Sequence, residues 1–335
     1  MQQSLLARML KIRIFRKSPV AAYLRLNEQL WRLFPTSLAA FLRPYAASLH
    51  ALARLSAIRR QNGSTYFFRN RPELELIRRL ADQKHTGATL RIAVLGCSNG
   101  AEVYSILWTI LSARPDLNVV THAVDISEEL LKFAQKGVYS LEATEFFGAQ
   151  IFERIAQEEM RLMFDREGHE LNIRSWIMEG ITWHPGDARD PDIINVLGPQ
   201  DIVVANRFLC HMDPPDAEKC LRNIARLVSP RGFLFVSGID LDIRTKVAHD
   251  LGWQPVRELM EQIHEGDRSL RDSWPWGYWG LEPFNKRRRD WKIRYVAAFR
   301  LWVNRSLSGL WLSKVTPYFD TQLDLMDFLA ALLEF

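Results

Sequence analysis

Cysteine is scarce in this sequence, and its scarcity excludes several classes of protein. Three cysteines, Cys97, Cys210 and Cys220, occur among 335 residues, and their spacing fits neither a disulfide framework nor a metal-binding motif. The eight histidines likewise show no ligand spacing such as HxxxH, so we expect no metal site. The odd cysteine count, with no small-residue cleavage site after the basic start, predicts a reduced, cytoplasmic setting.

Long apolar runs are also missing. No stretch reaches the roughly 18 uncharged apolar residues that a spanning helix needs, so none is predicted. The composition is 47% hydrophobic and 25% charged, which is ordinary for a globular protein. A chain of this length buries one good core and a smaller domain.

Acidic residues are nearly absent from the first 60 positions, which hold eleven Lys or Arg against the single acid Glu28. A second basic cluster, KRRRDWKIR, spans 286–294, whereas only acidic charges follow Lys314. Two interpretations stay open. The basic region packs against acidic surface of its own chain, or it docks on an acidic protein or an anionic membrane surface, which would place the protein at the membrane periphery. Nucleic acid is disfavoured as a partner because no recognition motif accompanies the charge.

The pattern of apolar residues divides the chain into three parts. Residues 1–60 show the three-and-four spacing of helices and form a basic N-terminal region. From Leu90, short apolar runs alternate with helical segments, which predicts a doubly wound α/β sheet, parallel for the most part. We expect this domain to span 61–303, with a small antiparallel insert at about 141–180 and WQPV and IRYVAAFRLW as its last strands. An amphipathic tail follows at 304–335.

Polar and glycine residues follow three successive predicted strands, where ligands bind in such sheets. The first turn, Gly96 to Glu102, is not GxGxxG, which disfavours a dinucleotide pyrophosphate site. Asp125 ends the second strand and is placed to accept ribose hydroxyls, although it also precedes the helix-capping Ser127. Asp187 follows the third strand, where an acid bonds an adenine amino group or caps a helix.

Several motifs, in the right order, resemble the chemotaxis receptor methyltransferase (CheR) family over roughly 60–240. They are STYFFRNRPEL, LRIAVLGCSNGAEVYSILWTI, AVDISEELLKFAQKGVYS and DIVVANRFLCHMDPPDAEKCLRNIARLVSPRGFLFVSG. The resemblance implies a Rossmann-like class I methyltransferase fold, S-adenosyl-L-methionine as cofactor, and methylation of glutamate carboxylates on receptor helices.

The resemblance also implies roles for individual residues. Thr65 and Arg69 would reach the cofactor from the segment before the core, and Asn206 and Arg207 would sit at the active-site strand end. The methionine portion would contact four residues of the first turn and helix, and the ribose and adenine would contact four others. These eight are Gly96, Ser98, Gly100 and Glu102, and then Asp125, Ile126, Asp187 and Ala188.

Three departures from the family bear on the methyl acceptor. The pattern of residues 1–60 differs, about 95 residues follow position 240, and the family's Arg-Asn-x-x-x-Tyr is here Asn206 to His211. Because an ionised carboxylate needs no base and a hydroxyl usually does, His211 raises the hypothesis of a small-molecule or saccharide hydroxyl acceptor. The alternative for His211 is a structural residue at a helix start. Catalytic candidates are thus Arg69, Arg207 and His211, and Arg69 alternatively lies on the surface beside two core aromatics.

Two other functions compete with an active methyltransferase, and one aromatic loop has two interpretations. A nicotinamide-dependent oxidoreductase and a degenerate methyltransferase that only binds cofactor are the competing classes. The aromatic run WPWGYWG lies in a loop at about 270–285. It forms either a stacking lid over the site or an anchor for the C-terminal segment.

Overall fold

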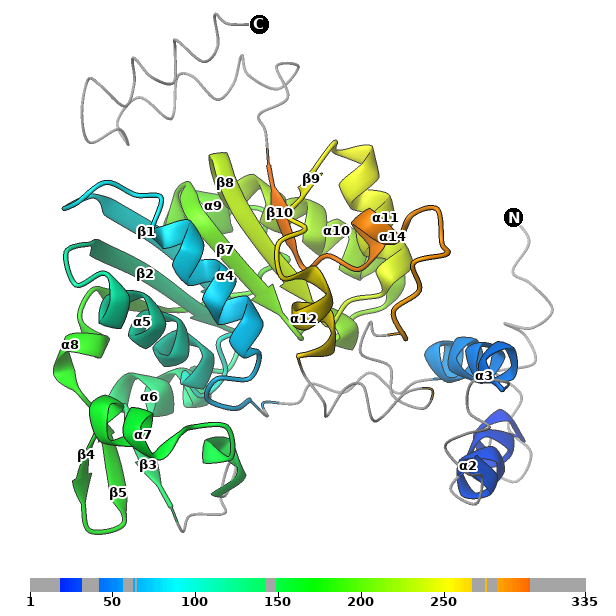
Figure 1. The fold of residues 1–335 in the computed structure, drawn as a ribbon, viewed down its shortest axis with the longest axis horizontal. Helices are drawn as coiled ribbons and strands as arrows, with labels where there is room; N and C mark the ends of the chain where they lie inside the picture. Colours follow the sequence, from blue (N-terminus) through cyan, green and yellow to red (C-terminus); the bar gives the residue numbers. More distant parts are fainter. Residues whose placement is uncertain are drawn as a thin grey trace, which may run out of the picture.

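The computed structural model describes residues 19–31, 42–56, 63, 65–141, 149–266, 275 and 282–301. Figure 1 shows an α/β core and, beside it, two helices of the N-terminal region. These helices are α2 (Pro19–Trp31) and α3 (Arg43–Ser56), in the part of the chain where the sequence predicted helices. Among the described residues, no helix combines the length and apolarity that crossing a bilayer requires.

A seven-stranded sheet forms the centre of the core, in the order β6-β2-β1-β7-β8-β10-β9. Five neighbouring strands run parallel, and β10 is antiparallel to both β8 and β9. The predicted doubly wound α/β class is therefore confirmed. The strands are β1 (Thr89–Leu95), β2 (Asn118–Asp125), β6 (Ile181–Pro185), β7 (Gln200–Asn206), β8 (Val228–Ser237), β9 (Gln254–Pro255) and β10 (Ala298–Arg300).

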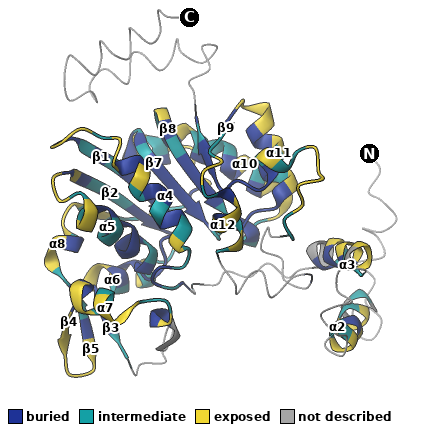
Figure 2. Cartoon of the chain, viewed as in Figure 1, coloured by how far each residue is buried: buried dark blue, intermediate teal, exposed yellow. Residues whose placement is uncertain are grey.

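Helices cover both faces of this sheet, and alternate strand residues enter two separate cores. On β1, Ile92 and Val94 pack with α4 and α5, whereas Ala93 and Leu95 pack with α9, α10 and α11. Such burial on two faces explains the apolar run IAVL in β1 (Figure 2). The helices are α4 (Arg71–Ala81), α5 (Ala101–Ala113), α6 (Glu128–Lys136), α9 (Ile193–Leu197), α10 (Pro214–Ile224) and α11 (Leu241–Asp250).

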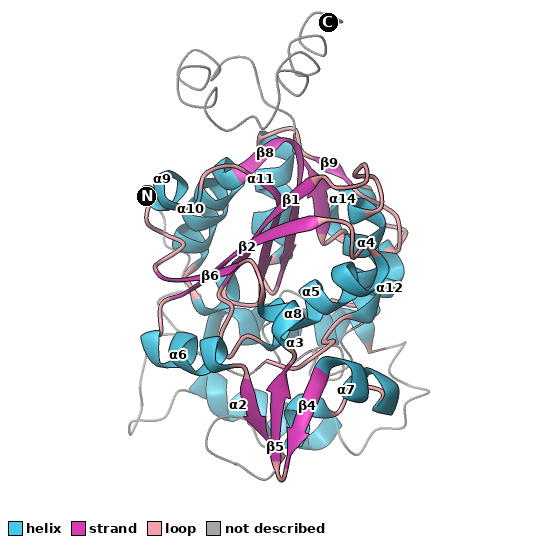
Figure 3. Cartoon of the chain, turned by 90° about the vertical axis from the view of Figure 1, so that its left-hand side faces the viewer, coloured by secondary structure: helices cyan, strands magenta, loops and turns pink. Residues whose placement is uncertain are grey.

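A three-stranded antiparallel sheet, ordered β3-β5-β4, is inserted between α6 and β6. Figure 3 shows it beneath the main sheet. It lies where the sequence predicted a small insert, with its first strand starting slightly earlier. The elements are β3 (Val138–Ser140), η2 (Ala149–Phe152), α7 (Gln157–Met163), β4 (Phe164–Glu167), β5 (Glu170–Ile173) and α8 (Ser175–Met178).

The end of the core differs from the sequence prediction. The segment predicted as one strand over 293–302 begins within helix α14 (Trp291–Arg294), and only Ala298–Arg300 form a strand. The physical reason is Arg294, which is 3% exposed and binds the carboxylates of Glu282 and Asp242. The helix α12 (Met260–Glu265) precedes this region. Of the predicted loop at about 270–285, only Pro275 and residues 282–285 are described. The rest of the aromatic run lies outside the described residues, as does the tail 304–335.

Candidate functional site

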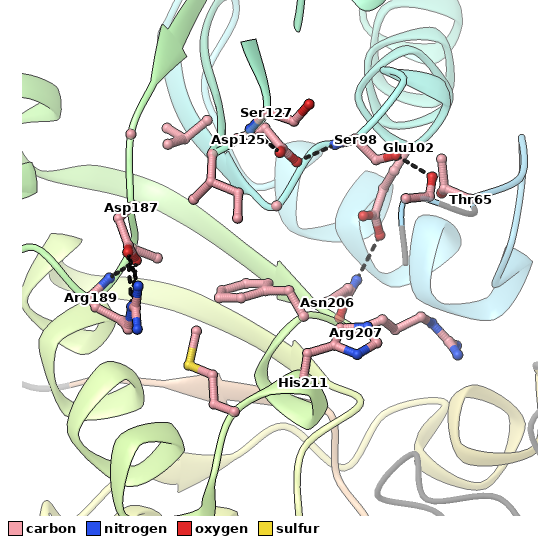
Figure 4. A pocket seen from close by; sticks show the side chains of 18 of the residues that line it. Thr65, Ser98, Glu102, Asp125, Ser127, Asp187, Arg189, Asn206, Arg207 and His211 are labelled. Atoms are coloured by element: carbon pink, nitrogen blue, oxygen red, sulfur yellow. Dashed lines mark hydrogen bonds and ion pairs between the residues drawn. The ribbon is translucent and has the colours of Figure 1, made fainter. Parts of the chain in front are cut away.

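A cavity of about 520 Å³ opens at the carboxyl ends of β1, β2, β6 and β7, as the sheet topology predicts (Figure 4). Of the site residues predicted from the sequence, all except Gly100 line it. The lining residues include Thr65, Arg69, Gly96, Ser98, Glu102, Asp125, Ile126, Asp187, Ala188, Asn206, Arg207 and His211.

The turn after β1 shapes one wall of the cavity. The N–H groups of Gly96 and Cys97 both donate to the carbonyl of Val124, which closes the turn against β2. Gly96 has a φ of +68°, and a Cβ there would lie 2.8 Å from the ring of Phe208. Glycine is therefore required by the close approach of the loop after β7 as well as by the backbone conformation.

Asp125 joins two strand ends. Its Oδ2 accepts the N–H of Ser98 at 2.8 Å, and its Oδ1 accepts the N–H of Ser127 at 2.9 Å. Ser127 itself caps α6 through its side chain, so Asp125 contributes to the cap indirectly. The carboxylate is 9% exposed and faces the cavity, and each oxygen keeps a further lone pair for a ligand hydroxyl.

Asp187 and Arg189 lie together at one end of the cavity, and Glu102 lies at the other, with Asp125 between them (Figure 4). Arg189 binds Asp187 through Nε at 2.8 Å and Nη2 at 2.5 Å. This ion pair lowers the pKa of Asp187. The carboxylate of Asp187 is therefore already engaged within its own loop, and the next residue, Ala188, is buried against the core.

Glu102 lies in the first turn of α5 and accepts a hydrogen bond from Nδ2 of Asn206 at 2.8 Å. Burial raises the pKa of Glu102, because a carboxylate loses its hydration there. A negative group in this position attracts a cationic ligand group.

The segment before α4 delivers two cavity residues and two core aromatics. Thr65 is 7% exposed, and Arg69 lines the cavity with its guanidinium 5.5 Å from the ring centre of Tyr66. Phe67 and Phe68 are fully buried, and the N–H of Phe68 donates to Ser105 Oγ at 2.9 Å. The two phenylalanines therefore belong to the core, as the alternative interpretation of this segment predicted. Arg69, in contrast to that interpretation, lines the cavity.

The loop after β7 carries the remaining catalytic candidates. Arg207 adopts a φ of +64°, its N–H donates to the carbonyl of Ser237, and its side chain lines the cavity. His211 ends the short helix η3 (Leu209–His211) and lines the same cavity. A left-handed conformation at a non-glycine residue is strained, and such strain concentrates at functional sites.

The cavity lining differs from the predicted site at Gly100 and at a few residues that were not predicted. Gly100, with φ +85°, packs against Ala134, Tyr104 and Trp183 rather than lining the cavity, so its contact with a cofactor stays a prediction. Sequence reasoning missed several lining residues, although the acids at the start of α10 offered a signal. The missed residues include Gly63, Gly186, Phe208, Met212, Asp213 and Asp216.

Comparison with known proteins identifies the family of the chain and its cofactor. The family described as CheR methyltransferase, SAM binding domain, matches residues 63–241, more than half of the chain. The chain belongs to the CheR methyltransferase family. Its cofactor is S-adenosylmethionine, and the nicotinamide alternative is removed. The matched segment contains every residue predicted to bind cofactor.

Two relatives of the chain are methyltransferases by name. The probable biofilm formation methyltransferase WspC of Pseudomonas aeruginosa is 27% identical over 216 residues, which are 62% of this chain and 48% of that protein. Chemotaxis protein methyltransferase 2 of Vibrio cholerae is 23% identical over 51% of this chain and 60% of that protein. This chain thus spans about half the length of WspC.

Among solved structures, magnesium protoporphyrin IX methyltransferase from Synechocystis PCC 6803 with bound S-adenosylmethionine is 17% identical. The match covers 65% of this chain and 87% of that one, at a TM-score of 0.32.

The residues of the cavity fit this cofactor. Glu102 offers a carboxyl group in the cavity wall, and a cationic ammonium group bound there would stabilise its ionised form against the effect of burial. Asp125 has free lone pairs toward the cavity, suited to ribose hydroxyls. The glycine at position 96 leaves the backbone of the turn uncovered by a side chain.

Proposed function

We propose that this protein transfers the methyl group of S-adenosylmethionine to a glutamate carboxylate of a protein acceptor. The observation that carries the proposal is the convergence of two arginines, Arg69 and Arg207, on the cavity that Glu102 lines. Guanidinium groups bind carboxylates through paired hydrogen bonds, so they suit an anionic acceptor. The names of the chemotaxis and Wsp relatives support a protein acceptor.

The cofactor lies, in this proposal, along the row of acids seen in Figure 4. The methionine portion contacts Gly96, Ser98, Gly100 and Glu102, and the cofactor also meets Thr65, Arg69 and Asn206. The ribose and adenine are held by Asp125 and Ile126, and the adenine is bordered by Asp187 and Ala188. The bound cofactor supplies an electrophilic methyl group on a sulfonium. The chain itself binds, orients and excludes water, since in-line displacement depends mainly on alignment.

Arg69 and Arg207 orient the acceptor. A glutamate carboxylate, with a pKa of about 4.3, is ionised at pH 7 and attacks without a general base. The arginines fix one oxygen so that the other faces the methyl group. Their charge also excludes a cationic acceptor such as a lysine side chain.

The test uses tritiated S-adenosylmethionine and a purified chemoreceptor cytoplasmic fragment, with a copy whose methylatable glutamates are changed to alanine. We expect label on the unaltered fragment only, and its release as volatile methanol in mild alkali, because esters hydrolyse there. Label that resists alkali, or that appears equally on both fragments, contradicts a carboxylate acceptor.

A second candidate function is methylation of a small-molecule or saccharide hydroxyl, favoured by the placement of His211 in the same cavity. There His211 takes the hydroxyl proton as methyl transfer proceeds. His211→Ala separates the two candidates. It spares transfer to a carboxylate and abolishes transfer to a hydroxyl, whose ether product is stable to alkali.

The basic N-terminal region serves, we propose, as a docking face for an acidic protein partner. On the described helix α2, Arg25 is exposed beside the exposed apolar side chains of Leu26 and Leu30. Arg25→Glu is expected to raise KM for the protein acceptor and to spare cofactor affinity. Sedimentation with vesicles containing phosphatidylserine tests the membrane alternative, and binding there without an effect on KM contradicts the docking role.

A further inference from the structure

The side-chain amide of Asn206 joins two glutamates from different helices. Its Nδ2 donates to Oε1 of Glu73 at 2.7 Å and to Oε1 of Glu102 at 2.8 Å. Its Oδ1 accepts the hydroxyl of Ser237 at 2.7 Å. The amide is thereby fixed between two carboxyl groups, so a change in the charge of one is felt by the other.

The two glutamates differ in their access to the cavity. Glu102 lines it, whereas Glu73, in the first turn of α4, is 4% exposed and lies behind Asn206. Oε2 of Glu73 has no hydrogen-bond partner within the described part of the chain. Ionising a buried carboxyl with an unsatisfied oxygen is costly, so the site favours a proton on Glu73.

The charged groups around Glu73 agree with this assignment. Burial, and then repulsion from Glu102, raise the pKa of Glu73 to about 7. The hydrogen bond from Asn206 and the positive charges of Arg207 and Arg244 only partly offset this rise. Glu73 therefore titrates near neutral pH.

Helix α12, which also packs on α4, directs its ionisable groups elsewhere. Glu261 pairs with Lys286, Nε2 of His264 contacts the carbonyl of Glu282, and Glu265 is exposed. On the cavity side, Arg69 and Arg207 face Glu102. The only carboxyl group that acts on Glu73 is thus Glu102 within the described residues.

We propose that Glu73 is a positioning residue that links cofactor binding to the release of a proton through Asn206 and Glu102. The positive ammonium of the cofactor, bound beside Glu102, offsets the negative charge of that carboxylate. The repulsion on Glu73 falls, and its proton leaves to the solvent. The inference rests on the cofactor site alone and stands whichever acceptor is used.

The sign of the pH effect follows from this linkage. A ligand that binds more tightly to the deprotonated site gains affinity as pH rises through the range in which Glu73 titrates. Near pH 7, binding releases at most about half a proton, because burial continues to raise the pKa of Glu73 after the repulsion from Glu102 falls. This release corresponds to a gain in affinity of up to about threefold per pH unit.

The test is calorimetric titration of S-adenosylhomocysteine at pH 7 in phosphate, HEPES and Tris, whose ionisation enthalpies differ. The slope of the observed enthalpy against the buffer enthalpy counts the protons released. We expect release of a fraction of a proton, up to about one half, by the unaltered protein and close to none by Glu73→Gln, which keeps the hydrogen-bonding shape but cannot ionise. Affinity of the variant at pH 7 should stay within a few-fold.

Glu75→Gln is the matched control on the same helix. Arg78 and Arg79 bind Glu75 and lower its pKa to about 2, so it does not titrate near neutrality. This variant should release the same proton fraction as the unaltered protein. Unchanged release in Glu73→Gln assigns the proton to another group, such as His211, and overturns the proposal. No release by the unaltered protein between pH 5.5 and 8.5 overturns it without any variant.

Discussion

The carboxylate of Asp125 accepts the backbone N–H of Ser98 at 2.8 Å, which ties the end of β2 to the turn after β1. Asp125 therefore both holds the backbone of the turn after β1 and lines the cavity. Ser98 has a φ of +52°, so the hydrogen bond also holds a residue in an unfavourable conformation. The backbone conformation of Ser98 is therefore coupled to the position of the Asp125 carboxylate, which in the proposed function binds the ribose.

Gly238 supports the loop that carries Arg207. It has a φ of +61°, and a Cβ there would lie 2.5 Å from the Cα of Arg207. Gly238→Ala should lower the free energy of unfolding by about 2 to 4 kcal/mol, because neither backbone can yield cheaply. It should also reduce methyl transfer by displacing Arg207. Gly87→Ala is the control, since nothing lies within 4 Å of that Cβ and only the strain of its φ of +76°, about 1 kcal/mol, remains. Equal losses in urea denaturation of the two variants contradict the account.

Arg69 is expected to bind the acceptor through its planar fork. Arg69→Lys keeps the charge but loses paired hydrogen bonds, so kcat/KM should fall roughly tenfold or more. The adjacent Arg71→Lys should leave kcat/KM unchanged, since Arg71 binds Glu159 and stacks on Phe68 away from the cavity. Steady-state assays of both variants check this, and equal activities would remove Arg69 from the site.

His264 makes stability depend on pH. Burial lowers its pKa from the ordinary value to about 4. The folded state favours the neutral form of His264. The contribution of His264 to the free energy of unfolding is therefore complete above the unfolded pKa of about 6.5, and it is lost as pH falls toward 4. Between pH 7.5 and pH 5, the unaltered protein should lose about 2 kcal/mol more than His264→Gln in urea denaturation. The exposed His85→Gln should behave as the unaltered protein does, and parallel losses in all three sink the assignment.

The ends of the parallel strands could be predicted from the sequence because each combines an apolar run with a following polar residue. That pattern located Gly96, Asp125 and Asp187, and the resemblance to the CheR family added Asn206. The structure brings all four to one cavity. Gly100 belongs to the same turn but packs toward α6. Which residues of the turn face the cavity depends on its backbone conformation, which the sequence pattern does not specify.

Other features depend on contacts that no local pattern contains. Glu73 lies among arginines and glutamates on α4, so the sequence gives no sign that its side chain is buried. Its hydrogen-bond partner, Asn206, is 133 positions away in the chain. Likewise, the alternation around Arg294 resembles a strand. In the structure Arg294 ends a helical turn, where its buried guanidinium binds Glu282 and the exposed Asp242.

Titration of S-adenosylhomocysteine into the unaltered protein and Asp125→Ala tests the central claim most directly. We predict micromolar binding by the unaltered protein and its loss in Asp125→Ala. Asp192→Ala, an exposed change at the start of α9, should bind normally. Thermal unfolding of each variant shows whether it is folded. A folded, unaltered protein that does not bind S-adenosylhomocysteine would contradict the account.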